Sequence, residues 1–293
     1  MKIRIFLSLG LCIGLAAQAQ TDSLAVKYAA SILTEDLKED LYVIAADSMQ
    51  GRETGTEGQA KAAAYIAEHF QSSGIPPFNG KDYYQQYKLY RTGNYEASLV
   101  IEGNSYGFLE DFYFLPGSPA LDQNEAEIVF AGYGLNQEGY NDYTAVDVKG
   151  KFVLVANGEP RDKEGLSHIS GEEEAGDYSS WRAKAKLAQE NGAAGIFIVD
   201  TAAEANAQRY AHYIERGRVS VEPPKANENP FITYFISPKM AQAMLKKDKK
   251  GWDKRLAKIA KKGQPYSAVV PSDLGLFVSF EQEELPAQNV LAY

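Results

Sequence analysis

The sequence predicts a mixed α/β (α+β) fold, and three observations support this. Two capped helices open the chain, aromatic-rich strands follow, and a strand–helix–strand unit lies near the middle. With 293 residues the chain is long enough for two domains, since about 150 residues per domain is usual. Its 45 % apolar and 24 % charged residues are ordinary for a globular protein.

The first 19 residues are typical of a secretory signal peptide. A short basic start precedes an apolar run over residues 5–17, and the small–x–small triplet AQA ends at Ala19. The run is shorter than the roughly 20 residues that a membrane-spanning helix needs. Leu11 precedes Cys12 where a lipoprotein signal has a small residue, so we expect no lipid anchor. The sequence therefore predicts cleavage after Ala19 and export to the periplasm or the extracellular space.

The charge balance excludes several partners. The chain has 30 basic and 39 acidic side chains, and cleavage after Ala19 removes two of the basic ones, which leaves a net charge of −11. A protein this acidic has no general attraction for nucleic acid or anionic lipid. The same cleavage removes Cys12, the only cysteine, and with it any thiol nucleophile. We therefore expect no nucleic-acid partner and no membrane anchor.

Two helices are predicted near the start of the mature chain. The first covers residues 35–47, with Thr34 as its N-cap. Leu37, Leu41, Ile44 and Ala45 make one apolar stripe along it. The second opens at Thr56, which fits a capping box with Gln59, and ends near Ser73.

The middle of the chain reads as strands around one crossover helix. Between residues 83 and 114, short aromatic-rich stretches alternate with polar residues, which favours antiparallel strands. Buried strands are predicted at 127–131, 151–156 and 194–199, and a helix over 181–191 separates the last two. These two strands should therefore be parallel, with a right-handed connection. The long link between residue 156 and this helix is expected to be an exposed excursion.

The last third predicts another strand, two helices and a return to strand. A strand over residues 231–236 is followed by a helix that Ser237 caps and Pro238 opens. Residues 246–262 hold nine basic side chains around a narrow apolar stripe. We interpret this run as the solvated face of a helix, the alternative being a surface that binds anions or membranes. Strand is expected again after Pro265, and residues 289–293 are expected to begin a buried strand.

Five motifs occur in the order that they have in one family of enzymes. They are AADSMQGRETGT at 45–56, the helix and turn at 61–75, VFAGYG at 129–134 with DY, DVKGK and GEP after it, the helix–strand unit at 184–199, and QNVLAY at 288–293. The chain resembles the N-terminal portion of secreted bacterial di-zinc aminopeptidases, which are relatives of leucine aminopeptidases and glutamate carboxypeptidase. The middle motifs resemble the protease-associated (PA) domain inserted in many such enzymes.

The resemblance implies a division into four segments. Residues 1–19 would be the signal peptide, 20–124 the N-terminal part of a zinc-peptidase α/β domain, 125–263 an inserted PA domain, and 264–293 the return to the peptidase domain. It also implies that the parent protein removes N-terminal residues from peptides by metal-activated water, with two zinc ions as cofactors. Peptides are then the expected partners of that parent.

The residues that hold zinc in this family are not found in the sequence. The family places them after the last motif, beginning with a His-x-Asp pair, and none of His69, His168 and His212 is followed by x-Asp. We therefore predict no catalytic, cofactor-binding or metal-binding residue in this chain. Zinc is expected only in a longer parent, and this chain alone is expected to be inactive.

Two sequence features superficially resemble sites. Glu172, Glu173 and Glu174 resemble the family's Glu-Glu-x-Gly pair of base and ligand, but they precede the return strand and lie in a polar stretch, so we interpret them as a solvated acidic loop. His168 and Glu172 would chelate a metal only on a helix, which Gly171 disfavours.

Three further residues have simpler interpretations. His69 and His212 are expected on helix surfaces rather than in a site. Gly132-x-Gly134 lacks the third glycine of a dinucleotide-binding fingerprint. Arg52 is expected to fix its glycine-rich turn through an ion pair with Glu53 or Asp47.

Two other classes of function stay open. One is a non-catalytic periplasmic module that binds peptides or proteins through the PA domain. The other, a periplasmic solute-binding protein, is disfavoured because the sequence shows a single strand–helix–strand unit and no two-lobed repetition.

Overall fold

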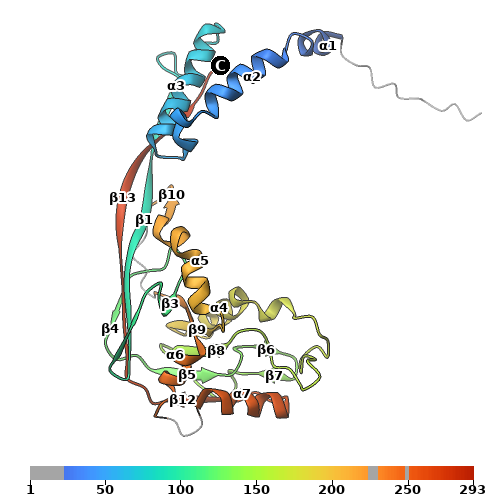
Figure 1. Ribbon diagram of the computed structural model, residues 1–293, viewed down its shortest axis with the longest axis vertical. Coiled ribbons are helices and arrows are strands. Elements are labelled where there is room, and N and C mark those ends of the chain that lie inside the picture. The colour runs from blue at the N-terminus through green and yellow to red at the C-terminus, as the bar shows by residue number, and fades with distance from the viewer. Residues whose placement is uncertain (1–22, 224–229, 248–250) are drawn as a thin grey trace, which may run out of the picture. The chain divides into compact units, whose positions relative to one another are not determined.

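The computed structural model describes residues 23–223, 230–247 and 251–293, so the predicted signal peptide lies outside the described residues (Figure 1). The chain has the predicted mixed α/β fold, divided into two compact units. The first unit comprises Met1–Gln85 and Gln288–Tyr293, and the second comprises Gln86–Ala287. The chain therefore leaves the first unit after Gln85 and re-enters it at Gln288.

The first unit is mainly helical. It contains α1 (Ser23–Ala29), α2 (Thr34–Ile44), the 3-10 helix η1 (Asp47–Arg52) and α3 (Glu57–Ser72). Thr56 caps α3 as predicted, since its hydroxyl accepts the N–H of Gln59 at 3.4 Å. The Gln59 side chain in turn accepts the N–H of Gly55 at 2.8 Å. The predicted capping box is confirmed, with its second bond one residue earlier than in the standard form.

Helix α2 differs from its prediction at both ends. Leu33 is the N-cap rather than Thr34, and the helix ends at Ile44 because the chain turns into η1 at Asp47. None of its residues is buried. Its apolar stripe lies on the surface, with Leu37 59 % and Leu41 66 % exposed.

The last residues of the chain complete the first unit. The N–H of Leu291 donates to the Tyr83 carbonyl at 2.8 Å, and the N–H of Tyr293 donates to the Pro76 carbonyl at 3.1 Å. The buried strand expected over residues 289–293 is wrong, because the strand ends at Val290 and both Asn289 and Tyr293 are exposed.

A five-stranded antiparallel sheet frames the second unit. Its order is β10 (Arg218–Ser220), β1 (Tyr84–Ile101), β13 (Leu274–Val290) and β4 (Leu121–Gln123), with β2 (Asn104–Gly107) paired to β1. The antiparallel prediction for this region is confirmed for β1 and β2. The expected series of short strands is wrong, because β1 runs unbroken for 18 residues. Gly93 does not interrupt it, and a Cβ built there would make only ordinary contacts, 3.5 Å from Gly217 Cα.

A six-stranded sheet forms the centre of the second unit (Figure 1). Its order is β12 (Ser267–Val270), β5 (Ile128–Ala131), β8 (Phe152–Ala156), β9 (Gly195–Val199), β11 (Ile232–Ile236) and β3 (Phe112–Tyr113). The four middle strands are parallel and the two outer ones antiparallel to their neighbours. The strands predicted from the four apolar runs, and the parallel pairing of β8 with β9, are confirmed.

Two apolar clusters cover the faces of this sheet. On one face, Val153, Val155 and Ile196 pack with residues of α4 (Trp181–Glu190) and α5 (Ala203–Arg216). On the other, Phe130 and Phe152 pack with α6 (Pro238–Met244), α7 (Gly251–Lys262) and the inner residues of β1 and β13. Alternate strand residues serve opposite clusters, as the strand period requires. Helix α5 is not anticipated by any of the sequence patterns above.

Smaller elements connect these layers. β6 (Asn136–Gln137) and β7 (Tyr140–Asn141) form a hairpin, and η2 (Asp177–Ser179) precedes α4. Ser237 caps α6 and Pro238 opens it, as predicted. Over the described ranges, the helices lack the combination of length and apolar character that spanning a bilayer requires.

Helix α7 departs from its prediction at one position. Lys254, Lys258 and Lys261 are exposed, as expected of a solvated face. Arg255 is buried instead, with its guanidinium 5.0 Å from the ring centroid of Phe130 and 5.3 Å from that of Tyr266. The apolar stripe therefore accommodates one cation through aromatic faces.

Candidate functional site

A buried polar cluster lies where β5 and β8 end. It consists of Asp142, Glu159, Arg161 and Lys184, of which Lys184 is 0 %, Asp142 1 % and Glu159 4 % exposed. These residues come from the β7 hairpin, the loop after β8 and helix α4. In open α/β sheets this edge, at the carboxyl ends of parallel strands, is where ligands usually bind.

Lys184 connects three loop carbonyls inside this cluster. Ser180 caps α4 by accepting the N–H of Ala183, and Lys184 then lies on the buried side of the first turn. Its ammonium donates to the carbonyls of Tyr133 at 2.7 Å and Ala156 at 2.8 Å, and to that of Gly158. An ammonium has three N–H donors, so each finds an acceptor. Burial lowers the pKa of Lys184 to about 7, against the opposing charges of Asp142 and Glu159.

The Asp142 carboxylate sits in a turn made by the GYG motif. One of its oxygens accepts the N–H groups of Tyr133 and Leu135, both at 3.1 Å. Gly132 adopts φ +48°, and a Cβ built there would lie 2.3 Å from the other Asp142 oxygen. Successive N–H groups around left-handed residues form such anion-binding concavities. The GYG and DY motifs are therefore two halves of one local structure.

The pH dependence of stability should reveal the buried Asp142 carboxyl. Burial raises its pKa from 3.8 to about 7, although the N–H groups of Leu135 and Tyr133 and the charge of Lys184 oppose this shift. Because the folded pKa is raised, Asp142 contributes stability that is full below pH 3.8 and lost as pH rises through about 7. Urea unfolding at pH 4.5 and 6.5 should show the native protein losing stability relative to Asp142→Asn, by up to about 1.4 kcal/mol per pH unit. A difference that does not change with pH would contradict this.

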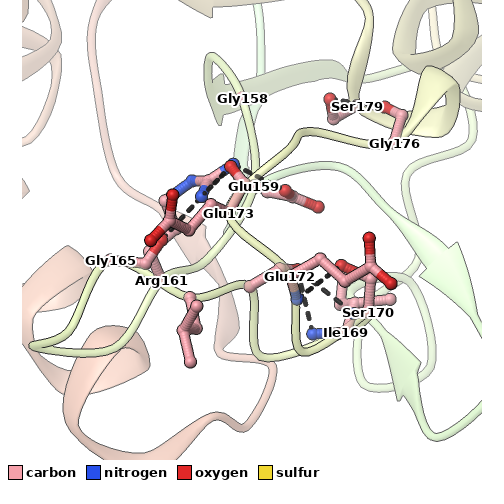
Figure 2. A network of polar contacts seen from close by, with 12 residues as sticks. Gly158, Glu159, Arg161, Gly165, Ile169, Ser170, Glu172, Glu173, Gly176 and Ser179 are labelled. Atoms are coloured by element: carbon pink, nitrogen blue, oxygen red, sulfur yellow. Dashed lines mark hydrogen bonds and ion pairs between the residues drawn. The ribbon is translucent and has the colours of Figure 1, made fainter.

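A second network fixes the excursion between β8 and α4 (Figure 2). Arg161 donates to a Glu159 carboxylate oxygen at 2.9 Å and to the carbonyls of Gly165 at 2.6 Å and Glu173 at 2.7 Å. The Tyr178 hydroxyl donates to the other Glu159 oxygen at 2.6 Å. The excursion is therefore only partly exposed, because the buried Glu159 anchors both of its ends.

The buried polar cluster can position loops, and three of its four charged groups are closed to a substrate. Asp142, Glu159 and Lys184 are buried, whereas the Arg161 side chain is 31 % exposed, and their partners are mostly backbone carbonyls and N–H groups. Catalytic groups must come within hydrogen-bond distance of a reacting molecule. We conclude that the cluster determines the shape of the loops at this edge of the sheet.

His168, one of the two residues that might have chelated a metal, has another partner in the structure. Nε2 of His168 lies 2.7 Å from the Ala260 carbonyl of α7, which ties the excursion to that helix. Glu172 is exposed, as are Glu173 and Glu174, which agrees with a solvated acidic loop. The Gly171 region forms bends rather than a helix.

The other singled-out residues lie on α3, α5 and η1. His69 is exposed on α3, with Nε2 3.1 Å from an Asp40 oxygen, and His212 is exposed on α5. The guanidinium of Arg52 donates to the Ile44 carbonyl, so it caps the end of α2. This capping role differs from the ion pair expected from the sequence. Over residues 23–223, 230–247 and 251–293, no three His, Cys, Asp or Glu side chains are grouped so as to hold a metal ion. The described residues therefore do not fit the two zinc ions that the resemblance implies for the longer parent.

Sequence reasoning missed Lys184 although a signal was present. Helical spacing from Trp181 places residues 184, 185 and 188 on one face, and two of these are alanines, which suit a buried face. A lysine on such a face needs buried acceptors, so it could have been named as part of a polar cluster.

Comparison with known proteins identifies one domain. The family model described as PA domain matches residues 124–233, which include β5, β8, β9, α4, α5 and the buried polar cluster. The chain therefore contains a PA domain. Strands β3 and β12, which complete the six-stranded sheet, lie outside the matched residues.

One of the solved structures that match this chain is that of a zinc aminopeptidase from Bacillus subtilis. It is 16 % identical, with a TM-score of 0.32, and the match covers 86 % of this chain and 44 % of that one. The present chain thus spans less than half the length of that protein, and a similarity this low identifies no function. A search of curated proteins finds no match.

Proposed function

We propose that this chain is the N-terminal part of an exported zinc-dependent aminopeptidase. The five ordered motifs and the PA domain support this proposal. In that enzyme the PA domain would be an insertion that shapes access of peptides to a catalytic domain. The signal-like first 19 residues support export, and the acidic charge supports peptides rather than nucleic acid as partners.

The observation that carries the proposal is the insertion topology. The second unit, which holds the PA domain, interrupts a first unit that the chain completes only after Ala287. Contacts distant in sequence close the first unit: the Gln59 side chain donates to the Gln288 carbonyl at 3.2 Å, and Asn289 to Gln85 at 3.0 Å. An enzyme domain with an inserted PA domain requires this kind of return.

The uncovered helices of the first unit also support a larger parent. Large apolar side chains of α1, α2 and their link are exposed by 53–68 %: Leu24, Val26, Tyr28, Ile32, Leu33, Leu37, Leu41 and Tyr42. Soluble proteins rarely leave so many neighbouring apolar side chains in water unless a partner covers them. In the proposal, the remainder of the peptidase domain covers this surface and supplies the zinc ligands and the general base.

The test compares two proteins that differ only in length. Residues 20–293 should neither retain two zinc ions after dialysis nor hydrolyse leucine p-nitroanilide. The product of the reading frame continued past the Tyr293 codon should do both, with a His-x-Asp pair in its added sequence. A stop codon directly after Tyr293, or two tightly bound zinc ions and activity in the shorter chain, would overturn the proposal.

A second candidate is a non-catalytic peptide- or protein-binding module. The second unit favours it, because this unit has its own apolar clusters on both faces of its central sheet. Such a module should resist limited proteolysis over the whole mature chain. The aminopeptidase proposal instead expects trimming of the uncovered helices toward residues 86–287.

A further inference from the structure

A hollow of about 180 Å³ opens in the second unit beside the end of β3. Its lining is mainly aromatic and aliphatic: Leu115, Pro116, Gly117, Ser118, Trp181, Phe231, Thr233 and Phe235. No part of the function proposed above uses it. Its lining shares helix α4 with the buried polar cluster but includes none of that cluster's residues.

The hollow exists because β3 stops pairing with β11 early. Tyr113 and Phe112 pair with Phe235 and Ile236, and the ladder does not continue toward Thr233. The chain has already left the ladder at Phe114, and Pro116, which has no N–H, could not rejoin it. Two backbones that would otherwise touch are left apart, and side chains of β11 face the space between them.

The wall made by the diverging chain is held by its own hydrogen bonds. The Gly117 N–H donates to the Tyr95 hydroxyl at 2.7 Å, and the Ser118 hydroxyl donates to the Leu115 carbonyl at 2.9 Å. Gly117 has φ +94°, which other residues rarely adopt. The wall therefore does not need a ligand to take its shape.

The aromatic residues at the bottom of the hollow are also held in place by their contacts. Phe235 is buried and stacks on Tyr113 with ring centroids 4.7 Å apart, while Trp181 meets it edge-on at 5.5 Å. The volume of about 180 Å³ is comparable to that of an apolar cavity of about 150 Å³ that holds one benzene molecule. A single large apolar side chain matches this space.

Two exposed arginines border the lining. The Arg182 guanidinium lies 4.3 Å from the Trp181 ring centroid. The Arg218 side chain lies against Gly117, with Nη1 3.1 Å from the position that a Cβ would take there. Their charge contrasts with the net charge of −9 of the chain. Guanidinium groups bind carboxylates through paired donors, so these two select an acidic neighbour for the apolar side chain.

We propose that the hollow binds a peptide segment through one phenylalanine- or leucine-sized side chain flanked by acidic residues. The apolar side chain enters between Trp181 and Thr233, and the carboxylates face Arg182 and Arg218. The proposal goes beyond the aminopeptidase assignment and does not depend on it, because every residue involved belongs to the second unit. Zinc and hydrolysis have no part in it.

The experiment measures fluorescence anisotropy of a labelled peptide, Ser-Glu-Phe-Glu-Gly amide, on residues 20–293. Thr233→Phe fills the hollow and should abolish binding, with tryptophan fluorescence on thermal unfolding confirming that the variant folds. Arg182→Gln with Arg218→Gln should raise Kd about tenfold, since it removes charged hydrogen bonds from exposed positions. Lys254→Gln with Lys261→Gln removes the same charge from α7, and its Kd should match that of the native chain.

Three outcomes would overturn the proposal. The first is a peptide with serine in place of phenylalanine that binds as well as the original. The second is equal weakening by the arginine and lysine pairs, which would indicate only general charge attraction. The third is concentration-dependent self-association that Thr233→Phe abolishes, which would identify a second copy of this chain as the occupant.

Discussion

Replacing Lys184 with methionine should destabilise the second unit by about 3 kcal/mol. Methionine keeps the length of the side chain but removes the donors from the carbonyls of Tyr133, Ala156 and Gly158. It also removes the ammonium charge that acts on Asp142 and Glu159, and breaking one partner of a buried charge cluster costs about 3–5 kcal/mol. Glu159 keeps its ion pair with Arg161 at 2.9 Å, and Asp142, with a pKa of about 7, is mostly protonated at pH 6. We place the loss at the lower end, because the methionine itself no longer carries a desolvated charge.

The measurement is urea unfolding at pH 6 followed by tryptophan fluorescence. Both tryptophans of the chain, Trp181 and Trp252, lie in the second unit, so the signal reports on that unit alone. Lys186→Met is the matched control, since Lys186 lies on the same helix and makes only an exposed contact with Glu190 at 3.8 Å. The control should change stability by less than about 0.5 kcal/mol. Equal shifts for the two variants would show that the buried ammonium is not what holds the loops.

Gly132→Ala should destabilise the protein by about 3 kcal/mol for a steric reason. The added Cβ would lie 2.3 Å from an oxygen of Asp142, whose carboxylate cannot retreat without losing the N–H groups of Tyr133 and Leu135. Overpacking of this kind costs about 1–3 kcal/mol, and a left-handed conformation adds about 1 kcal/mol for any residue with a Cβ.

Gly139→Ala separates these two contributions. Gly139 also has a positive φ, of +76°, but a Cβ there meets nothing within 4 Å. This variant should lose only about 1 kcal/mol in the same urea experiment. If both alanine variants lost the same amount, the contact with Asp142 would have no measurable effect, and the GYG turn would need only its backbone conformation.

Local patterns in the sequence predicted much of the second unit. The apolar runs that became β5, β8, β9 and β11 are almost entirely buried, and a short run without polar residues has few alternatives to a buried strand. The caps at Thr56 and Ser237 were readable because each side chain bonds a backbone N–H three residues later. Such features depend on neighbours in sequence alone.

What could not be predicted depends on contacts distant in sequence. The stripe of α2 has the right spacing for burial, yet no described residue covers Leu37 or Leu41. Arg255 reads as one more charge in a basic run, and only the placement of Phe130 and Tyr266 makes its burial tolerable. The buried polar cluster depends on a turn, a loop and a helix that meet only in the folded unit. Spacing within one segment carries no record of these partners.

The insertion topology also determines the order in which the chain can fold. The bond between Gln59 and Gln288 joins residues 229 positions apart, so the first unit cannot close until the ribosome has delivered nearly the whole described chain. Closing so long a loop of unfolded chain costs about 4–5 kcal/mol of entropy. Once the second unit has folded, its two chain ends are fixed and most of that entropy has already been lost, so the bond between Gln85 and Asn289 closes a much shorter loop. The second unit should therefore fold before the first. Mutations that slow its folding should lengthen the time for which the apolar helices of the first unit are exposed to aggregation and proteolysis.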